Sequence, residues 1–161
     1  MVQHINKICI ADLVEDRIFI SPAGLAKEAL LEQLAKLLCQ ADNRLHFPDI
    51  FQQILAREAE LSTTLDSGLS IPHVRLDGFD KVLAALAVLP EPLPDTGVQP
   101  IKAVFLFITP IRYEFFQTHL RVLSAAVEVL SPQCMAQLAA CTTIEQVSAL
   151  LRKAGPGGEM I

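Results

Sequence analysis

Two short apolar runs decide the fold of this chain: VLAALAVL at residues 82–89 and KAVFLFIT at residues 102–109. Each run has the length of a strand, and uninterrupted apolar runs of this kind are typical of strands covered on both faces. Four prolines and a glycine separate the two runs, between Pro90 and Pro100. We expect a stiff connector there that is neither helix nor central strand, because proline fixes φ and lacks an N–H group.

Helix and strand signals also precede the two runs. Asp16–Ile20 is predicted to form a short strand, and Ser21-Pro22 has the chemistry of a helix start, which predicts a helix to about Cys39. A second helix is expected from Phe47-Pro48 onward. Leu69–Ile71 has the pattern of a further short strand that ends at Pro72.

The part of the chain after the second run is predicted to be helical. A long helix is expected over Tyr113–Leu130, with one apolar side facing the core: Phe116, Leu120, Leu123, Val127 and Leu130. Ser131-Pro132 indicates another helix start, and Thr142-x-x-Glu145 is a capping-box pattern for a last helix that ends at Gly155. Helices that alternate with covered strands indicate an α/β layered domain.

Composition excludes several classes of protein. The 161 residues are 52% hydrophobic and 19% charged, which supports one sizeable core and suits a single domain over residues 1–161. The net charge is −5 and no basic stripe occurs, so nucleic-acid binding is not expected. The apolar runs are too short to cross a bilayer, and charged residues interrupt the first 20 positions, so neither direct membrane insertion nor a signal peptide is expected. We therefore expect a cytoplasmic globular protein.

Metal and cofactor signatures are lacking in the sequence. The four cysteines form no C-x-x-C pair and the four histidines are scattered, which favours buried reduced thiols over a zinc site. No glycine-rich nucleotide loop and no common hydrolase motif occurs. We expect no metal, nucleotide or organic cofactor.

Two histidines are candidates for chemistry. His73 follows Pro72 at the end of a predicted strand and is expected to begin a polar turn that contains Arg75. Strand ends in α/β sheets present side chains to solvent from a rigid base, although a lone histidine there is more often an ordinary surface residue. His119 lies in the long predicted helix, where it is either functional or a residue packed beside the core.

The segment around His73 carries a family resemblance. The run REAELSTTLDSGLSIPH at Arg57–His73 resembles the phosphorylation-site signature of phosphotransferase-system enzyme IIA domains of the fructose/mannitol/nitrogen-regulatory type. The second half is similar to the same family: VFLFITP at residues 104–110, THL at residues 118–120 and TTIEQ at residues 142–146. The resemblance covers roughly residues 5–154, which we expect to be the ordered core.

The resemblance implies a single domain in which a mixed β-sheet is flanked by helices on both faces. It implies that His73 accepts a phosphoryl group, that His119 is a second active-site histidine and that Arg57 is a supporting cation. Histidine titrates near neutral pH and so offers an unprotonated nucleophilic nitrogen there. Ser62 and Thr63 are expected to supply hydroxyl donors for phosphate, or else to be turn-forming residues.

Two functions are compatible with this resemblance. In the first, a phosphotransferase component takes a phosphoryl group from HPr or an HPr-like carrier protein and passes it to a IIB partner in sugar uptake. In the second, a nitrogen-type regulatory module changes its binding to target proteins when His73 is phosphorylated. A degenerate relative that is not phosphorylated is a third alternative.

The surface next to His73 and two departures from the signature bear on that choice. Leu76 or Phe79 is expected to be partly exposed on a docking surface, the alternative being that both are core residues. Asp66 stands where family members commonly carry an additional loop glycine, and Val74 stands where glycine is frequent. Both changes predict altered geometry around the site.

Overall fold

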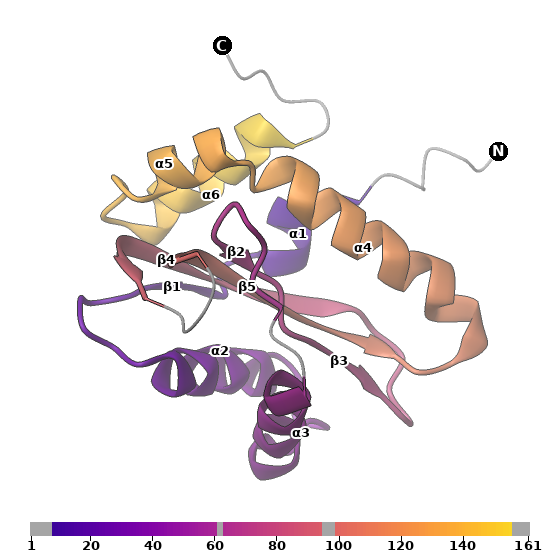
Figure 1. Ribbon diagram of the computed structural model, residues 1–161. Helices are drawn as coiled ribbons and strands as arrows, with labels where there is room; N and C mark the ends of the chain where they lie inside the picture. The colour runs from indigo at the N-terminus through magenta and orange to yellow at the C-terminus, as the bar shows by residue number, and fades with distance from the viewer. Residues whose placement is uncertain (1–7, 61–62, 95–98, 156–161) are drawn as a thin grey trace, which may run out of the picture.

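The computed structural model describes residues 8–60, 63–94 and 99–155, and these contain a five-stranded mixed sheet with helices on both faces (Figure 1). The strands are β1 (Ile18–Ile20), β2 (Leu69–Ser70), β3 (His73–Leu76), β4 (Leu83–Leu93) and β5 (Ile101–Pro110). Their order is β1-β4-β5, with β2 and β3 both paired to the far side of β5. This confirms the expected fold class.

The two central strands are the apolar runs that the sequence indicated. β4 and β5 pair antiparallel, whereas β1 pairs with β4 and both β2 and β3 pair with β5 in parallel. Alternate residues of β4 belong to two separate hydrophobic cores, as their side chains point to opposite faces. Ala84, Leu86 and Val88 face one core, and Ala85, Ala87 and Leu89 face the other.

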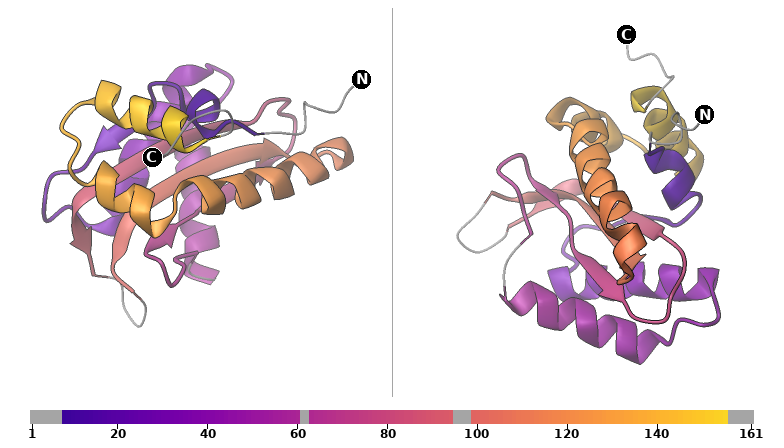
Figure 2. Two further views of the ribbon diagram at one scale, coloured as in Figure 1. Left: turned by 90° about the horizontal axis from the view of Figure 1, so that it is seen from above. Right: turned by 90° about the vertical axis from the view of Figure 1, so that its right-hand side faces the viewer.

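The helices form one layer on each face of the sheet, as Figures 1 and 2 show. One layer contains α2 (Lys27–Ala41) and α3 (Phe47–Glu60). The opposite layer contains α1 (Ile10–Val14), α4 (Phe116–Val129), α5 (Pro132–Leu138) and α6 (Ile144–Ala154). A short 3₁₀ helix, η2 (Tyr113–Phe115), leads into α4.

The predicted helix start at Ser21-Pro22 is wrong. Ser21 is buried and its backbone N–H donates to the carbonyl of Val88, so the chain continues along the sheet at this point. A turn at Gly24, with φ of +84°, then redirects the chain, and α2 begins only at Lys27 without a side-chain cap. Proline after serine is thus used here for a strand exit.

The proline-rich connector also differs from the expectation. β4 extends through Pro90 and Pro92 to Leu93. The pairing of β4 with β5 shifts register between Val88 and Leu93, and such an irregularity tolerates residues that lack an N–H donor. The prolines therefore lie in the strand where its ladder is interrupted.

The face of α4 that packs on the sheet is not the predicted one. The side chains buried against the core are His119, Val122, Ala126 and Val129. The predicted stripe faces outward in large part, with Phe116, Leu120 and Val127 each close to half exposed. At α6 the capping interaction is shifted by one residue, because Thr143 accepts from the Gln146 N–H and the Gln146 side chain accepts from the Thr142 N–H.

Among the described residues, no helix combines the length and the apolar character that crossing a membrane requires.

Gly68, at the turn before β2, is expected to tolerate no side chain. Its φ is +95°, and a Cβ atom would lie 2.9 Å from the Pro100 carbonyl oxygen. Gly68→Ala should therefore lower the free energy of unfolding by roughly 2–3 kcal/mol, measured by urea denaturation. Gly24→Ala is the matched control, since Gly24 has a similar φ with open space around it, and it should cost only about 1 kcal/mol. Equal losses would show that crowding at Gly68 is unimportant.

Candidate functional site

His73 is the first residue of β3, and the polar turn expected after it is instead a strand. His73 pairs with Phe107 of β5 in the parallel register. Val74 and Leu76 are buried, while His73 and Arg75 are partly exposed on the other face of the strand. The two-residue alternation thus anchors the segment in the core and presents both polar side chains to the same side.

The hydrogen bond of His73 fixes which ring nitrogen can react. Its Nδ1 lies 2.8 Å from the carbonyl oxygen of Ile71. A carbonyl oxygen can only accept, so Nδ1 carries the proton and the neutral ring has its free lone pair on Nε2. The ring also stacks on Phe107, with centroids 5.3 Å apart and planes inclined by 17°. The nucleophilic nitrogen is therefore Nε2, on a ring held from two sides.

His119 of α4 lies edge-on to His73. The two ring centroids are 5.2 Å apart and their planes are inclined by 64°. His119 is 7% exposed, its ring contacts Phe107 at 5.3 Å, and its Nδ1 lies 2.9 Å from the Thr109 hydroxyl oxygen. The structure thus brings together the two histidines that the sequence singled out, on the shared apolar floor of Phe107.

The environment of His119 keeps its ring neutral at pH 7. Burial lowers the pKa of His119 from 6.5 to about 4, and the nearby charges of His73, Arg75 and Arg57 lower it further in the same direction. A neutral imidazole has one N–H donor and one acceptor nitrogen. Since Nδ1 contacts Thr109, Nε2 is the nitrogen left for a group bound in the site.

Acidification is expected to destabilise the protein through His119. The unfolded chain binds a proton at the ordinary pKa near 6.5, whereas the folded pKa is about 4, so between these values the unfolded state holds more protons. Stability is therefore fully present above pH 6.5 and decreases as the pH falls toward 4, by at most about 3 kcal/mol. Urea unfolding at pH 7 and pH 4.5 should show a smaller loss in His119→Gln. The same loss in both proteins would contradict the assignment.

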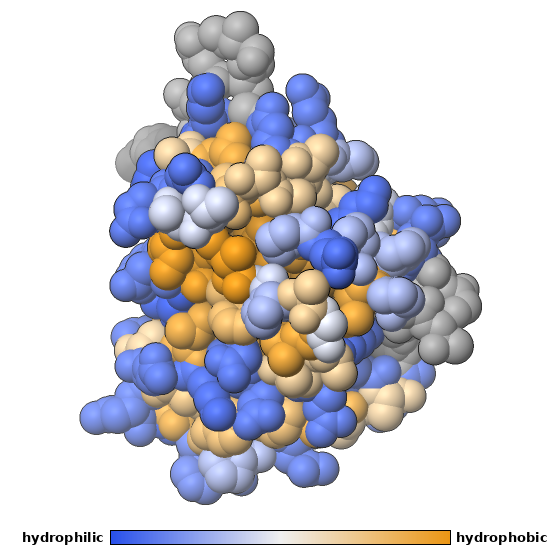
Figure 3. All heavy atoms as spheres, turned by 90° about the vertical axis from the view of Figure 1, so that its left-hand side faces the viewer, coloured by the Kyte–Doolittle hydropathy of each residue, from blue (hydrophilic) through white to orange (hydrophobic). Residues whose placement is uncertain are grey.

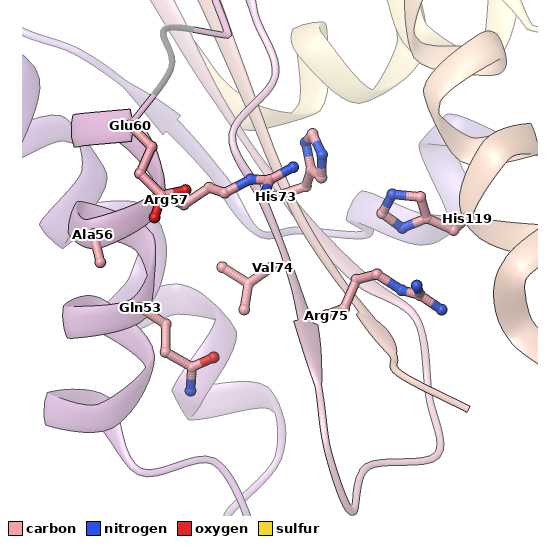
Figure 4. A pocket seen from close by; sticks show the side chains of 8 residues that line it. All are labelled: Gln53, Ala56, Arg57, Glu60, His73, Val74, Arg75 and His119. Atoms are coloured by element: carbon pink, nitrogen blue, oxygen red, sulfur yellow. The ribbon is translucent and has the colours of Figure 1, made fainter. Parts of the chain in front are cut away.

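Two arginines contribute positive charge to a cavity beside the histidines. The cavity has a volume of about 360 Å³ and is lined by Gln53, Ala56, Arg57, Glu60, His73, Val74, Arg75 and His119. Figure 4 shows Arg57 reaching from α3 toward His73, while Arg75 extends from β3 beside His119. Glu58, the alternative partner for Arg57, is engaged by Lys27 at 3.0 Å and by the Thr63 hydroxyl at 2.8 Å. An unprotonated nitrogen, a neutral imidazole and two guanidinium groups suit transfer of a small anionic group.

Arg75 is a cavity residue that the sequence analysis did not assign to the site. Its Nη2 donates to the carbonyl of Ile111 at 3.3 Å, and its guanidinium lies over the Phe116 ring at 5.8 Å. The signal was present, because side chains two positions apart on a strand share a face, so Arg75 follows His73. The signal was missed because residues 73–76 were expected to form a turn.

The two predicted hydroxyl donors differ in what the structure says of them. Ser62 lies outside the described residues. Thr63 donates its hydroxyl to Glu58 and does not line the cavity. In the described structure Thr63 therefore stabilises the end of α3, and any contact with phosphate remains a prediction.

The two departures from the signature have different structural contexts. Val74 is buried in the core on the α2–α3 side of the sheet, so its side chain contributes to the packing of β3. Asp66 is exposed and is not among the residues that line the cavity. A carboxylate there does not oppose an anion held between the two histidines at close range.

The predicted docking surface next to His73 is corrected by the structure. Leu76 and Phe79 are 6% and 3% exposed and belong to the core, as the alternative had it. Exposed apolar side chains lie instead on the chain that leads from β5 into α4: Ile111, Tyr113, Phe116 and Leu120. Apolar surface is not confined to this region, since Figure 3 shows it also on the left-hand side of Figure 1. The site is therefore identified by its chemistry and not by apolar exposure.

Comparisons with known proteins agree with this arrangement. The family model described as phosphoenolpyruvate-dependent sugar phosphotransferase system, EIIA 2, matches residues 13–154. A nitrogen regulatory protein of Pseudomonas putida is 32% identical over 81 residues, covering 50% of this chain and 91% of that protein. A multiphosphoryl transfer protein of Salmonella typhimurium is 35% identical over 128 residues, covering 78% of this chain and 32% of that protein. The crystal structure of nitrogen regulatory protein IIA-Ntr from Neisseria meningitidis is 26% identical, covers 88% of this chain and 98% of its own, and has a TM-score of 0.73.

Proposed function

The chain belongs to the EIIA type 2 family of the phosphoenolpyruvate-dependent sugar phosphotransferase system, and on that premise we propose that it is a phosphohistidine carrier. The phosphoryl group is accepted on Nε2 of His73 and later passed to a second protein. The observation that carries this proposal is the hydrogen bond from His73 Nδ1 to the Ile71 carbonyl, which leaves Nε2 as the free nucleophile beside two guanidinium groups.

The transfer step follows from the side chains around the cavity. The lone pair of His73 Nε2 attacks phosphorus, and the bond between phosphorus and the donor histidine nitrogen breaks, so that nitrogen recovers its electron pair. The three phosphoryl oxygens carry negative charge throughout, and Arg57 and Arg75 offset that charge. His119 Nε2 donates a hydrogen bond to one of these oxygens. Alignment and charge neutralisation, which are the main requirements of phosphoryl transfer, thus come from protein groups.

The donor in this proposal is HPr or an HPr-like phosphocarrier, and the acceptor is a IIB domain. His73 is partly exposed and the cavity opens to the surface, so the histidine of another protein can approach its ring. Resemblance to a multiphosphoryl transfer protein supports a place in a chain of phosphoryl transfers. The net charge of −5 favours encounter with a positively charged carrier surface.

A regulatory output is the second candidate. The relatives in Pseudomonas and the similar Neisseria structure are nitrogen regulatory proteins, which favours a module whose phosphorylation state controls protein binding. In this version His73 is phosphorylated by the same step, and the exposed apolar residues near the start of α4 would contact the target. The two outputs differ only in what receives the signal.

Phosphorylation in a defined mixture tests the proposal. The protein is incubated with phosphoenolpyruvate, enzyme I and HPr, and in parallel with the nitrogen-branch relative of HPr, followed by intact-mass measurement. We expect one phosphoryl group that is lost on acid treatment, and none when enzyme I is omitted. Transfer onward to a IIB domain would support sugar uptake, and retention of the phosphoryl group in its presence would favour the regulatory output. No phosphorylation with either carrier would contradict the proposal and favour a degenerate relative.

A further inference from the structure

A buried hydroxyl group lies near the end of β5, where the strand is otherwise apolar. Thr109 is fully buried, and its Oγ1 lies 2.9 Å from Nδ1 of His119. Removing a hydroxyl group from water costs free energy unless it is hydrogen-bonded. The contact with His119 therefore accounts for a polar side chain at this place in the core, and it ties the central strand to the second active-site histidine.

The face of β5 that carries Thr109 also supports the ring of His119. Phe107 and Thr109 are two residues apart, so their side chains point to the same face of the sheet. Phe107 contacts the His119 ring at 5.3 Å, while Thr109 contacts its Nδ1. Threonine is branched at Cβ and has few preferred rotamers, so its hydroxyl is held in place by the strand backbone. Orientation and hydrogen bonding of the ring thus come from one rigid element.

The direction of this hydrogen bond decides what His119 can do in the cavity. If Nδ1 held the ring proton and donated to Thr109, Nε2 would present a lone pair to the site. A lone pair there would repel phosphoryl oxygens and would also face the free lone pair of His73 Nε2. If the hydroxyl donates to Nδ1, the ring proton resides on Nε2 and His119 becomes a hydrogen-bond donor toward the cavity.

We propose that Thr109 is a positioning residue whose hydroxyl donates to His119 Nδ1 and holds the ring in the tautomer with its proton on Nε2. The catalytic consequence, a donor aimed at the phosphoryl group on His73, rests on the proposed function. The tautomer itself does not, because it is a property of the unphosphorylated protein. The residue acts through His119 and touches no reacting atom.

The first test measures the tautomer directly. Long-range ¹H–¹⁵N correlation spectra of the wild-type protein at pH 7, without phosphate, should show His119 protonated on Nε2 and unprotonated on Nδ1. Thr109→Ser retains the hydroxyl and should give the same pattern, whereas the isosteric Thr109→Val should move His119 toward a mixture of tautomers. A proton on Nδ1 of His119 in the wild-type protein would overturn the proposal, and this outcome requires no variant to fold.

The second test measures the rate of phosphorylation by the phosphorylated carrier. Thr109→Val should be slowed about tenfold, Thr109→Ser should remain within about threefold of wild type, and the exposed control Thr142→Val should be unchanged. A wild-type rate and an unchanged tautomer in Thr109→Val would refute the positioning role. If the wild-type protein accepts no phosphoryl group at all, the proposed function fails, while the spectra still decide the role of Thr109.

Discussion

His73→Ala is expected to carry no acid-labile phosphate after incubation with phosphoenolpyruvate, enzyme I and the phosphocarrier protein. The variant removes the free Nε2 that the contact with Ile71 leaves available for attack. His119 is a poor substitute, because it is 7% exposed and its Nδ1 is engaged by Thr109. Intact-mass measurement before and after acid treatment checks this result. A phosphoryl group found on His119 in this variant would show that His73 is not the acceptor.

The variant should remain folded, which separates loss of chemistry from loss of structure. The His73 side chain is partly exposed, and β3 is anchored in the core by Val74 and Leu76. Thermal unfolding followed by circular dichroism should therefore give a cooperative transition like that of the wild type. His46→Ala is a matched control, because His46 is an exposed histidine paired with Asp49 at 3.2 Å, and it should be phosphorylated fully.

His119→Ala is expected to slow phosphoryl transfer by roughly ten- to a hundredfold without removing the modification. A hydrogen bond to a charged group contributes about 1.5–3 kcal/mol, which corresponds to this range of rates. The measurement is the single-turnover rate of transfer from the phosphorylated carrier. His73 retains its nucleophilic nitrogen in this variant, so the final level of phosphorylation should reach that of the wild type.

His119→Gln distinguishes hydrogen bonding from packing at this position. The glutamine amide can still donate to a phosphoryl oxygen, so its rate should lie between those of wild type and His119→Ala. Wild-type rates in both variants would make His119 a packing residue of α4. Equally slow transfer in both would show that the imidazole ring itself is required.

The central part of the fold could be predicted from the sequence because it depends on hydrophobicity alone. The runs that became β4 and β5 are apolar at nearly every position, and only strands covered on both faces need that pattern. The face of α4 could not be predicted in the same way. The helix has two stripes that are largely apolar, and the buried one contains a histidine and a small alanine, so the more hydrophobic stripe was the wrong choice.

The site was predicted in part, for reasons that can be traced to single residues. His73, His119 and Arg57 were found through their motif, and the structure places all three around one cavity. Thr109 gave no signal, because a threonine at the end of an apolar strand is common and its partner is set by how α4 packs. The hydrogen bond of His73 with Ile71 was equally hidden, since it depends on the backbone direction at Pro72.

The parallel pairing of β3 with β5 determines when, during folding, the site comes into existence. β4 and β5 are consecutive antiparallel strands, which can pair after closing a short loop, whereas β3 must reach β5 across the intervening strand β4. Contacts between distant parts of a chain form late in folding. A partly folded state that retains the β4–β5 pair but has released β3 would keep much of its core and yet separate His73 from Phe107. Hydrogen exchange at the β3 amides would therefore report the fraction of molecules in which the histidines are assembled.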